Sequence, residues 1–193
     1  LDIETLNVET LAGTYDISAI SFALYPLIKD DYALLRTAVS FGEGYGPKLI
    51  KRKGERLKRN FKVALSGKYM TNALLFRIAY PDARITYMNF LDIEEAVRSG
   101  AVHAGVLIHE SILTFSDELE VEKELWDVWQ ELCEDKTNPL PLGGMAIRRS
   151  IPLSKAIAYE NTLTKAVEVA RERKEELCTL LVEQDLVRIE GET

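Results

Sequence analysis

Short apolar runs alternate along the chain with longer stretches in which apolar residues recur every three or four positions. The short runs are rich in β-branched residues and predict strands near residues 15–20, 33–39, 47–51, 61–65, 84–89, 104–108 and 144–148. Strands that alternate with helices in this way are typical of an α/β fold, in which helices cover a largely parallel sheet.

The longer stretches predict amphipathic helices with apolar residues on one face. They cover residues 71–80, 93–99 and 118–134, and a further helix is predicted to begin at Thr162 with Asn161 as its N-cap. No internal repeat and no low-complexity segment interrupts this order, so we expect an ordinary packed α/β protein.

The composition narrows the class of protein. The chain has 193 residues, a formal net charge of −7 and 47% hydrophobic residues, which is enough to build a core without disulfides or a structural metal. The acidic balance argues against nucleic acid or an anionic membrane surface as the main partner. The basic run of residues 51–62 has no aromatic residue before Phe61 to stack on bases, so we interpret it as a solvated connector.

The cysteines and the apolar segments indicate the cellular compartment in which the protein is expected. Cys133 and Cys178 lie far apart without a CxxC spacing, so we expect free thiols in a reducing compartment and no metal site. No apolar stretch approaches the roughly 20 residues of a membrane span, and no charged-then-apolar leader is present. We therefore expect a cytoplasmic protein without a membrane span. The chain begins at Leu1 inside a patterned segment, and an N-terminal strand is expected to be missing.

Two breaks rich in glycine or proline divide the pattern. They are residues 42–47 (GEGYGP) and residues 138–144 (NPLPLGG). Both are candidate places where the chain leaves one lobe and returns to it. The first break is not a dinucleotide loop, because Pro47 stands where the last glycine is needed and a predicted strand follows.

The clearest candidate for chemistry is His109, which directly follows the apolar run of residues 104–108. Ligands bind at the carboxyl ends of strands in open α/β sheets, so His109 is either a catalytic group that moves a proton or a hydrogen-bonded structural residue. The segment is not an HExxH zinc helix, because Leu113 occupies the place of the second histidine. His103, before the same run, is expected to be a surface residue.

Polar residues follow two other predicted strands. Residues 66–71 (SGKYMT) are typical of a glycine turn and helix start that binds an anion on free backbone N–H groups, with Thr71 lending its hydroxyl. A simple helix N-cap is the alternative interpretation. Ser21 follows the strand near residues 15–20. We expect serine, threonine and histidine at three strand ends to converge on one polar ligand.

Six segments resemble, in order, the family of chorismate dehydratases and dihydroxynaphthoate synthases, and most of all its 1,4-dihydroxy-6-naphthoate synthases of the futalosine route to menaquinone. They are DIETLN (2–7), YDISAISFALYPLI (15–28), GEGYGP (42–47), SGKYMTNALL (66–75), AGVLIHESILTF (104–115) and LPLGGMAIRR (140–149).

The resemblance implies a two-lobed α/β fold like that of type II periplasmic binding proteins, with a ligand cleft between the lobes. One lobe would comprise residues 1–45 and 140–193, and the other residues 46–139. It also implies a lyase of menaquinone biosynthesis that needs no cofactor and converts cyclic dehypoxanthinyl futalosine into 1,4-dihydroxy-6-naphthoate.

The resemblance also assigns site residues. His109 matches the catalytic general base. The substrate contacts would be Asn7, Ser21 and Thr71, and Gly67 would let the backbone approach a carboxylate of the substrate.

Some positions depart from the family pattern. Ser66 and Met70 stand where the family has a proline and a threonine, so one hydroxyl contact is lost. A Ser-Pro-Cys-Pro-Asn-Asp-Thr segment with an aspartate near the ligand is absent, and the match becomes faint beyond about Ser154.

Two alternatives stay open. One is chorismate dehydratase of the same pathway, against which the HESILTF segment argues. The other is a non-catalytic binding protein for a small carboxylate, supported by Met70. The expected partner is a small-molecule carboxylate in each case, and the oligomeric state is left open.

Overall fold

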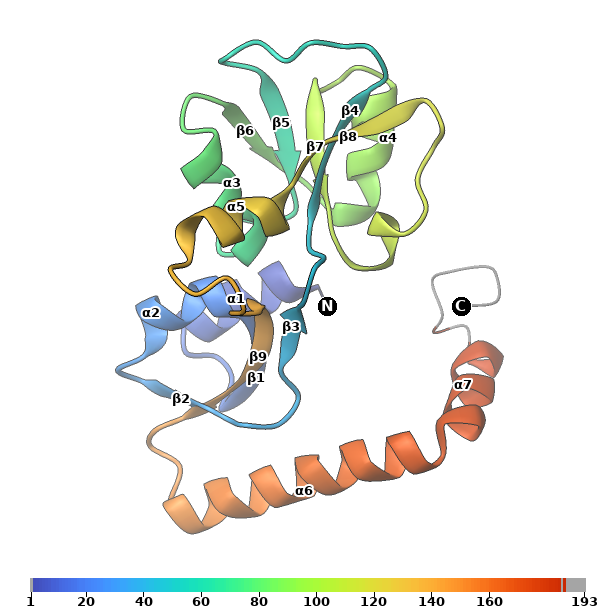
Figure 1. The fold of residues 1–193 in the computed structure, drawn as a ribbon. Helices are drawn as coiled ribbons and strands as arrows, with labels where there is room; N and C mark the ends of the chain where they lie inside the picture. The colour runs from blue at the N-terminus through green and yellow to red at the C-terminus, as the bar shows by residue number, and fades with distance from the viewer. Residues whose placement is uncertain (1, 185, 187–193) are drawn as a thin grey trace.

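Two β-sheets, each with its own helices, form the body of the molecule (Figure 1). A computed structural model describes residues 2–184 and residue 186. We call the sheet around β9, lower in Figure 1, sheet A, and the sheet of β4 to β8, upper in Figure 1, sheet B. The chain passes between them twice, once from β3 to β4 and once from α5 to β9.

Sheet A is built around the strand β9 (Leu140–Arg148). Three strands pair antiparallel with it: β1 (Ile17–Ser21), β2 (Tyr32–Leu34) and β3 (Ser40–Gly42). The short helical segments of this half are α1 (Ile3–Leu11), η1 (Phe22–Leu24) and α2 (Tyr25–Ile28). Asp2 caps α1 by accepting a hydrogen bond from the Thr5 backbone N–H at 2.7 Å. The hydrophobic core cluster of this half consists of Ile20, Leu24, Ile28, Tyr32 and Ala146.

Sheet B has five strands in the order β6-β5-β7-β4-β8. They are β4 (Lys48–Arg52), β5 (Lys62–Leu65), β6 (Arg84–Tyr87), β7 (Ala104–Leu107) and β8 (Leu119–Glu124). The helices of this half are α3 (Thr71–Ala79), η2 (Phe90–Asp92), α4 (Ile93–Arg98), η3 (His109–Ile112) and α5 (Leu125–Leu132).

Both faces of sheet B are buried, because its central strands carry apolar residues on each side. Leu49, Val63 and Leu65 pack with Phe76 of α3 and Leu125 of α5 on one face. On the other face, α4 packs so closely on β7 that a Cβ at Gly105 would lie 2.4 Å from Ile93 Cγ2. This double burial explains the continuous apolar runs that predicted the strands.

The prediction of a largely parallel sheet was wrong. Only the pairs β5–β6 and β5–β7 are parallel, whereas β4 is antiparallel to both β7 and β8, and every pair of sheet A is antiparallel. The cause is the passage between the sheets. The strand β4 enters sheet B at the end where β7 leaves it, as the pairing of Lys48 with Leu107 records.

The prediction of one helix over residues 118–134 was also wrong, since its first part is β8 and only Leu125–Leu132 are helical as α5. Glutamates alternate with other residues along β8, and their charges are satisfied across the sheet. Lys51 of β4 lies 2.6 Å from Glu122 and 3.5 Å from Glu120. These cross-strand ion pairs stabilise residues 119–124 as a strand rather than as the first part of a helix.

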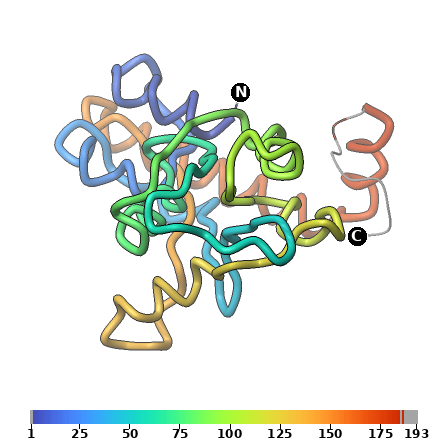
Figure 2. Tube along the Cα trace, turned by 90° about the horizontal axis from the view of Figure 1, so that it is seen from above, coloured from blue at the N-terminus to red at the C-terminus, as the bar shows by residue number. Residues whose placement is uncertain are grey.

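The C-terminal helix starts earlier than predicted. α6 begins at Leu153 after Pro152, not at Thr162 after Asn161, and covers Leu153–Glu172. α7 (Lys174–Glu183) follows it. Neither helix, each described along its whole length, has a buried residue, and Figures 1 and 2 show α7 standing apart from both sheets.

No helix of the described residues combines the length and the apolar character that crossing a membrane requires. Both cysteines are free thiols, as predicted, with Cys178 exposed and Cys133 partly buried.

Candidate active site

A cavity of about 500 Å³ lies where the two sheets meet. Its walls come from β1, the segment between β3 and β4, the start of α3, the segment after β7, and β9. Most lining side chains are apolar, and the polar ones are Ser21, Ser40, Tyr45, Thr71, Asn72, His109 and Glu110. A mostly apolar cavity with few polar groups is typical of a site for a small organic ligand.

His109 lies on the sheet B side of this cavity, directly beyond β7. Its backbone has φ 55°, a left-handed conformation that costs a residue other than glycine about 1–3 kcal/mol. The exposed imidazole packs edge-to-face against Phe90, with 5.4 Å between the ring centroids. The packed scaffold therefore holds this ring at the cavity, and strain of this kind is frequent at functional sites.

Ser21 and Thr71 meet in the lining of the same cavity, and both are almost fully buried, with 2% and 7% of their surfaces exposed. The Ser21 hydroxyl accepts a hydrogen bond from the Thr71 backbone N–H at 2.8 Å, and the two hydroxyl oxygens are 2.9 Å apart. Both hydroxyls also lie within 3.3 Å of the Leu142 carbonyl oxygen. We call Ser21 and Thr71 the hydroxyl pair. Its two hydrogens can turn toward a ligand oxygen.

Asn7 stands behind the hydroxyl pair and does not line the cavity. Its side chain is fully buried, and its Oδ1 accepts a hydrogen bond from the Ser21 backbone N–H at 2.9 Å. Its Nδ2 donates to Glu4 Oε2 at 3.3 Å and lies 3.6 Å from Met70 Sδ. Asn7 therefore fixes the backbone of Ser21.

Gly67 also lies outside the cavity lining, in the turn between β5 and α3. The sequence predicts that a ligand carboxylate approaches this turn, but the carboxylate next to it belongs to Glu4. The Lys68 N–H donates to Glu4 Oε1 at 2.6 Å, and the Tyr69 N–H lies 3.2 Å from both carboxylate oxygens. A Cβ at position 67 would come within 2.4 Å of that carboxylate. Gly67 thus makes room for Glu4.

Several cavity residues, Asn72 and Ala38 among them, are missing from the sequence prediction. Asn72 is 2% exposed, and its Nδ2 donates to Ser66 Oγ at 3.1 Å. Ala38 reaches the cavity from sheet A with φ 57°. The position of Asn72, directly after Thr71 in the first turn of a helix, is a signal that could have indicated it. Nothing in the sequence marks Ala38.

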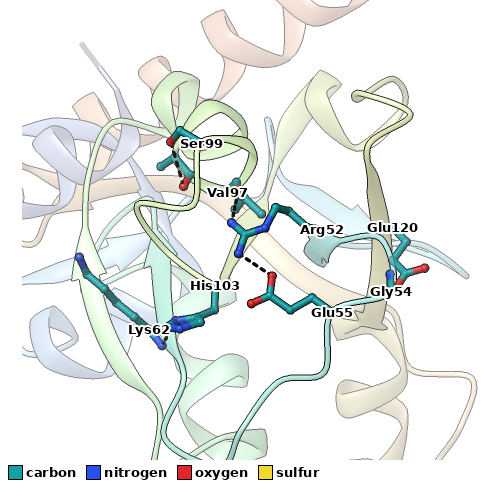
Figure 3. Close-up of polar contacts among 9 residues, drawn as sticks. Arg52, Gly54, Glu55, Lys62, Val97, Ser99, His103 and Glu120 are labelled. Carbon is teal, nitrogen blue, oxygen red and sulfur yellow. Dashed lines mark hydrogen bonds and ion pairs between the residues drawn. The ribbon is translucent and has the colours of Figure 1, made fainter.

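His103 lies at the other end of β7, as Figure 3 shows, and it is exposed as predicted. It makes two contacts with Lys62: its N–H donates to the Lys62 carbonyl at 2.9 Å, and its Nδ1 accepts from the Lys62 N–H at 3.0 Å. Arg52 nearby pairs with Glu55 at 2.7 Å and donates to the Val97 carbonyl at 2.8 Å. This end of sheet B is a structural network.

Among residues 2–184 and 186, no three or more His, Cys, Asp or Glu side chains lie close enough together to hold a metal ion.

Comparison with known proteins gives a family. A family model described as menaquinone biosynthesis matches residues 1–190. A protein of Streptomyces coelicolor named 1,4-dihydroxy-6-naphtoate synthase is 34% identical over 157 residues, which are 78% of this chain and 55% of that protein. A Thermus thermophilus protein of the same name is 29% identical over 179 residues, 91% of this chain and 64% of that protein. The chain thus spans between about half and two thirds of these relatives.

Solved structures agree with the two-lobed architecture. The crystal structure of protein AF1704 from Archaeoglobus fulgidus is similar with a TM-score of 0.84 and 34% identity, over 91% of this chain and 66% of that chain. The periplasmic aliphatic sulphonate binding protein SsuA of Escherichia coli has a TM-score of 0.59 at 15% identity, over 93% of this chain and 61% of that chain. The predicted type II periplasmic-binding-protein-like fold is confirmed.

Proposed function

The chain belongs to the menaquinone biosynthesis family, and we propose that it is a lyase that converts cyclic dehypoxanthinyl futalosine into 1,4-dihydroxy-6-naphthoate without a cofactor. The observation that carries the proposal is that His109 and the hydroxyl pair line the same cavity. The names of the two synthase relatives support this reaction.

The hydroxyl pair would bind the substrate carboxylate. A carboxylate oxygen is a stronger acceptor than the Leu142 carbonyl that both hydroxyls approach in the free protein. Both hydroxyl hydrogens can therefore turn to the ligand while Asn7 keeps the Ser21 backbone fixed. The apolar lining suits the ring system of the substrate.

His109 would act as the general base. A neutral imidazole can accept a proton from a ring carbon of the substrate, and the electron pair of that C–H bond enters the ring as the bond to the ribose-derived fragment breaks. The fragment leaves with the electron pair of the broken bond and takes up a proton from the imidazolium or from water. The product ring is aromatic, and its formation drives the reaction. A closed and dry cavity assists this step, because water would compete for the base.

The two lobes would close on the substrate. We propose residues 1–45 with 140–193 as one lobe and residues 46–139 as the other, which agrees with the strands that form sheet A and sheet B. Closure would bring Ser21 of one lobe to Thr71 and His109 of the other and exclude water. The free thiols support a setting in the reducing cytoplasm.

The proposal is tested by incubating the purified full-length protein with cyclic dehypoxanthinyl futalosine and measuring the naphthoate product by chromatography. We expect product with the wild-type protein and none above background with the substrate alone. A protein that forms no product would contradict the proposal. Chorismate as the substrate in a parallel reaction separates the chorismate dehydratase alternative.

One observation favours a second candidate, a binding protein for a small carboxylate without catalysis. Met70 lines the cavity beside Thr71. The family that this chain resembles has the hydroxyl group of a threonine at the position of Met70. This candidate predicts that 1,4-dihydroxy-6-naphthoate raises the unfolding temperature, following RT ln(1 + [L]/Kd), while cyclic dehypoxanthinyl futalosine stays unconverted.

A further inference from the structure

The turn between β5 and α3 holds a carboxylate that the chain itself supplies. Glu4 reaches from α1 of the sheet A half to the backbone N–H groups of Lys68 and Tyr69 in the sheet B half. The 2.6 Å contact to Lys68 is a short, charge-assisted hydrogen bond, a kind about twice as strong as a neutral one. Glu4 is partly buried, so water competes for its oxygens less than at an open surface.

This contact closes a ring of hydrogen bonds around the hydroxyl pair. Glu4 Oε2 accepts from Asn7, and Asn7 accepts from the Ser21 N–H. Ser21 in turn bonds to Thr71, whose backbone follows that of Tyr69 by two residues and so leads back to Glu4. A displacement of the turn at one point of this ring is transmitted to the spacing of the two hydroxyl groups.

We propose that Glu4 is a positioning residue, whose carboxylate fixes the turn at Gly67, Lys68 and Tyr69 and thereby holds Thr71 at bonding distance from Ser21. This inference rests on the proposed function of the cavity, since it concerns how a ligand carboxylate is bound there. Glu4 does not line this cavity, but it lines a smaller adjoining hollow together with Met70 and His109. Its effect passes through the two backbone N–H groups and through Asn7.

The role of Gly67 follows from the same geometry. A Cβ at this position would lie 2.4 Å from the Glu4 carboxylate, while the glycine backbone is not in a left-handed conformation. An alanine is therefore excluded by the carboxylate and not by backbone strain. Gly67→Ala should have the same effect as removal of Glu4, and no large additional effect once Glu4 is absent.

The experiment compares the full-length wild type with Glu4→Ala, Glu4→Gln, Gly67→Ala and the double variant Glu4→Ala/Gly67→Ala. The binding of 1,4-dihydroxy-6-naphthoate is measured by titration calorimetry. We expect Glu4→Ala and Gly67→Ala each to weaken binding by about tenfold, and the double variant to bind as weakly as either alone. Glu4→Gln keeps one acceptor oxygen and should lose about threefold. Losses that multiply in the double variant would overturn the proposal.

Added formate distinguishes positioning from a general loss of stability. A formate ion fits the space that Glu4→Ala leaves at the two N–H groups, so it should restore most of the binding in that variant and little in Gly67→Ala. Glu9→Ala is the matched control, because Glu9 lies on the same helix and bonds only locally, to Thr14 at 2.7 Å. Formate without effect on Glu4→Ala, or an equal loss in Glu9→Ala, would overturn the proposal.

Amide NMR separates this inference from the proposed function. In Glu4→Ala, the proton resonances of the Lys68 and Tyr69 amides should move upfield and return when formate is added. Unchanged resonances would refute the Glu4 contact itself, whatever the protein catalyses. If the two amide resonances move in Glu4→Ala and return with formate, but the wild type does not convert cyclic dehypoxanthinyl futalosine, only the proposed reaction is refuted.

Discussion

The hydroxyl oxygens of Ser21 and Thr71 lie 2.9 Å apart, although 50 positions separate the two residues in the chain. Ser21 ends β1 of sheet A, and Thr71 begins α3 of the other half. The pair therefore exists only while the two halves are in contact. A ligand that binds to both hydroxyls would also bind the halves to each other, and would in this way couple ligand binding to the proposed lobe closure.

Removal of either hydroxyl should weaken substrate binding. We expect Ser21→Ala and Thr71→Val each to raise KM about tenfold with a much smaller change in kcat, because one hydrogen bond to a charged group contributes about 1.5 kcal/mol. Ser99→Ala is the control, since that exposed hydroxyl contacts only the Ala96 carbonyl. Steady-state kinetics provides the measurement. A fall in kcat without a change in KM would assign the pair to another step.

Replacement of His109 should abolish the chemistry while leaving binding intact. We expect His109→Asn to lower kcat at least about 100-fold, the usual contribution of a general base, with product affinity changed less than threefold. The matched control is His103→Asn at the other end of β7, where Nδ1 bonds to the Lys62 N–H. His103→Asn should turn over normally. Normal turnover by His109→Asn would remove the proposed base.

The attachment of α6 should weaken in acid. Glu160 accepts hydrogen bonds from the Thr37 hydroxyl at 2.5 Å and the Arg36 N–H at 3.0 Å. The hydrogen bond from the Thr37 hydroxyl lowers the pKa of Glu160 below its ordinary 4.5, and the backbone N–H groups of Arg36 and Thr37 lower it further. A lowered folded-state pKa adds stability above pH 4.5, and this contribution is lost as the pH falls through the folded-state pKa.

Glu160→Gln tests this pH dependence. Urea unfolding at pH 7 should show the wild type to be the more stable protein, and the difference should shrink as the pH is lowered below 4.5. Glu168→Gln on the same helix is the control, because its contact with Lys165 is an exposed pair at 3.5 Å. A wild-type advantage that persists unchanged in acid would exclude Glu160 as its source.

Gly105→Ala should destabilise sheet B. Its Cβ would meet Ile93 Cγ2 at 2.4 Å and Val97 Cγ2 at 2.9 Å, so α4 must move away from β7. We expect a loss of about 1–3 kcal/mol in the free energy of unfolding, the usual cost of overpacking a core. Urea unfolding measures this loss. Turnover gives a second measurement, because His109 directly follows β7. Unchanged stability would mean that α4 is loosely packed.

Burial explains which parts of the fold the sequence could predict. The central strands β5 and β7 of sheet B stand out because their residues are buried on both faces, as Ala64 and Val106 are. Strand direction does not follow from burial, so the antiparallel entry of β4 was not predictable from composition or period. The residues from Glu118 onward fitted a helical pattern. Their pairing with β4, where Lys51 binds Glu122, makes them the strand β8 instead.

The candidate site likewise has residues that the sequence could predict and residues that it could not. His109, Ser21 and Thr71 each lie at an end of a regular element, and position alone predicts that they converge. The places of Asn7 and Glu4 depend on how α1 packs across the turn at Gly67, which no local pattern encodes. A sequence therefore reveals groups at strand ends sooner than the side chains that hold them.

The two passages between the sheets lie side by side, since Gly42 of β3 pairs with Leu140 of β9 and a Cβ at Gly46 would lie 3.0 Å from the Leu140 side chain. In the proposed closure, these paired connections would act as a hinge. Two adjacent connections would let the halves swing apart but would resist their sliding or twisting more than one connection could. An opening movement would therefore carry His109 along a single arc and return it to the same place each time.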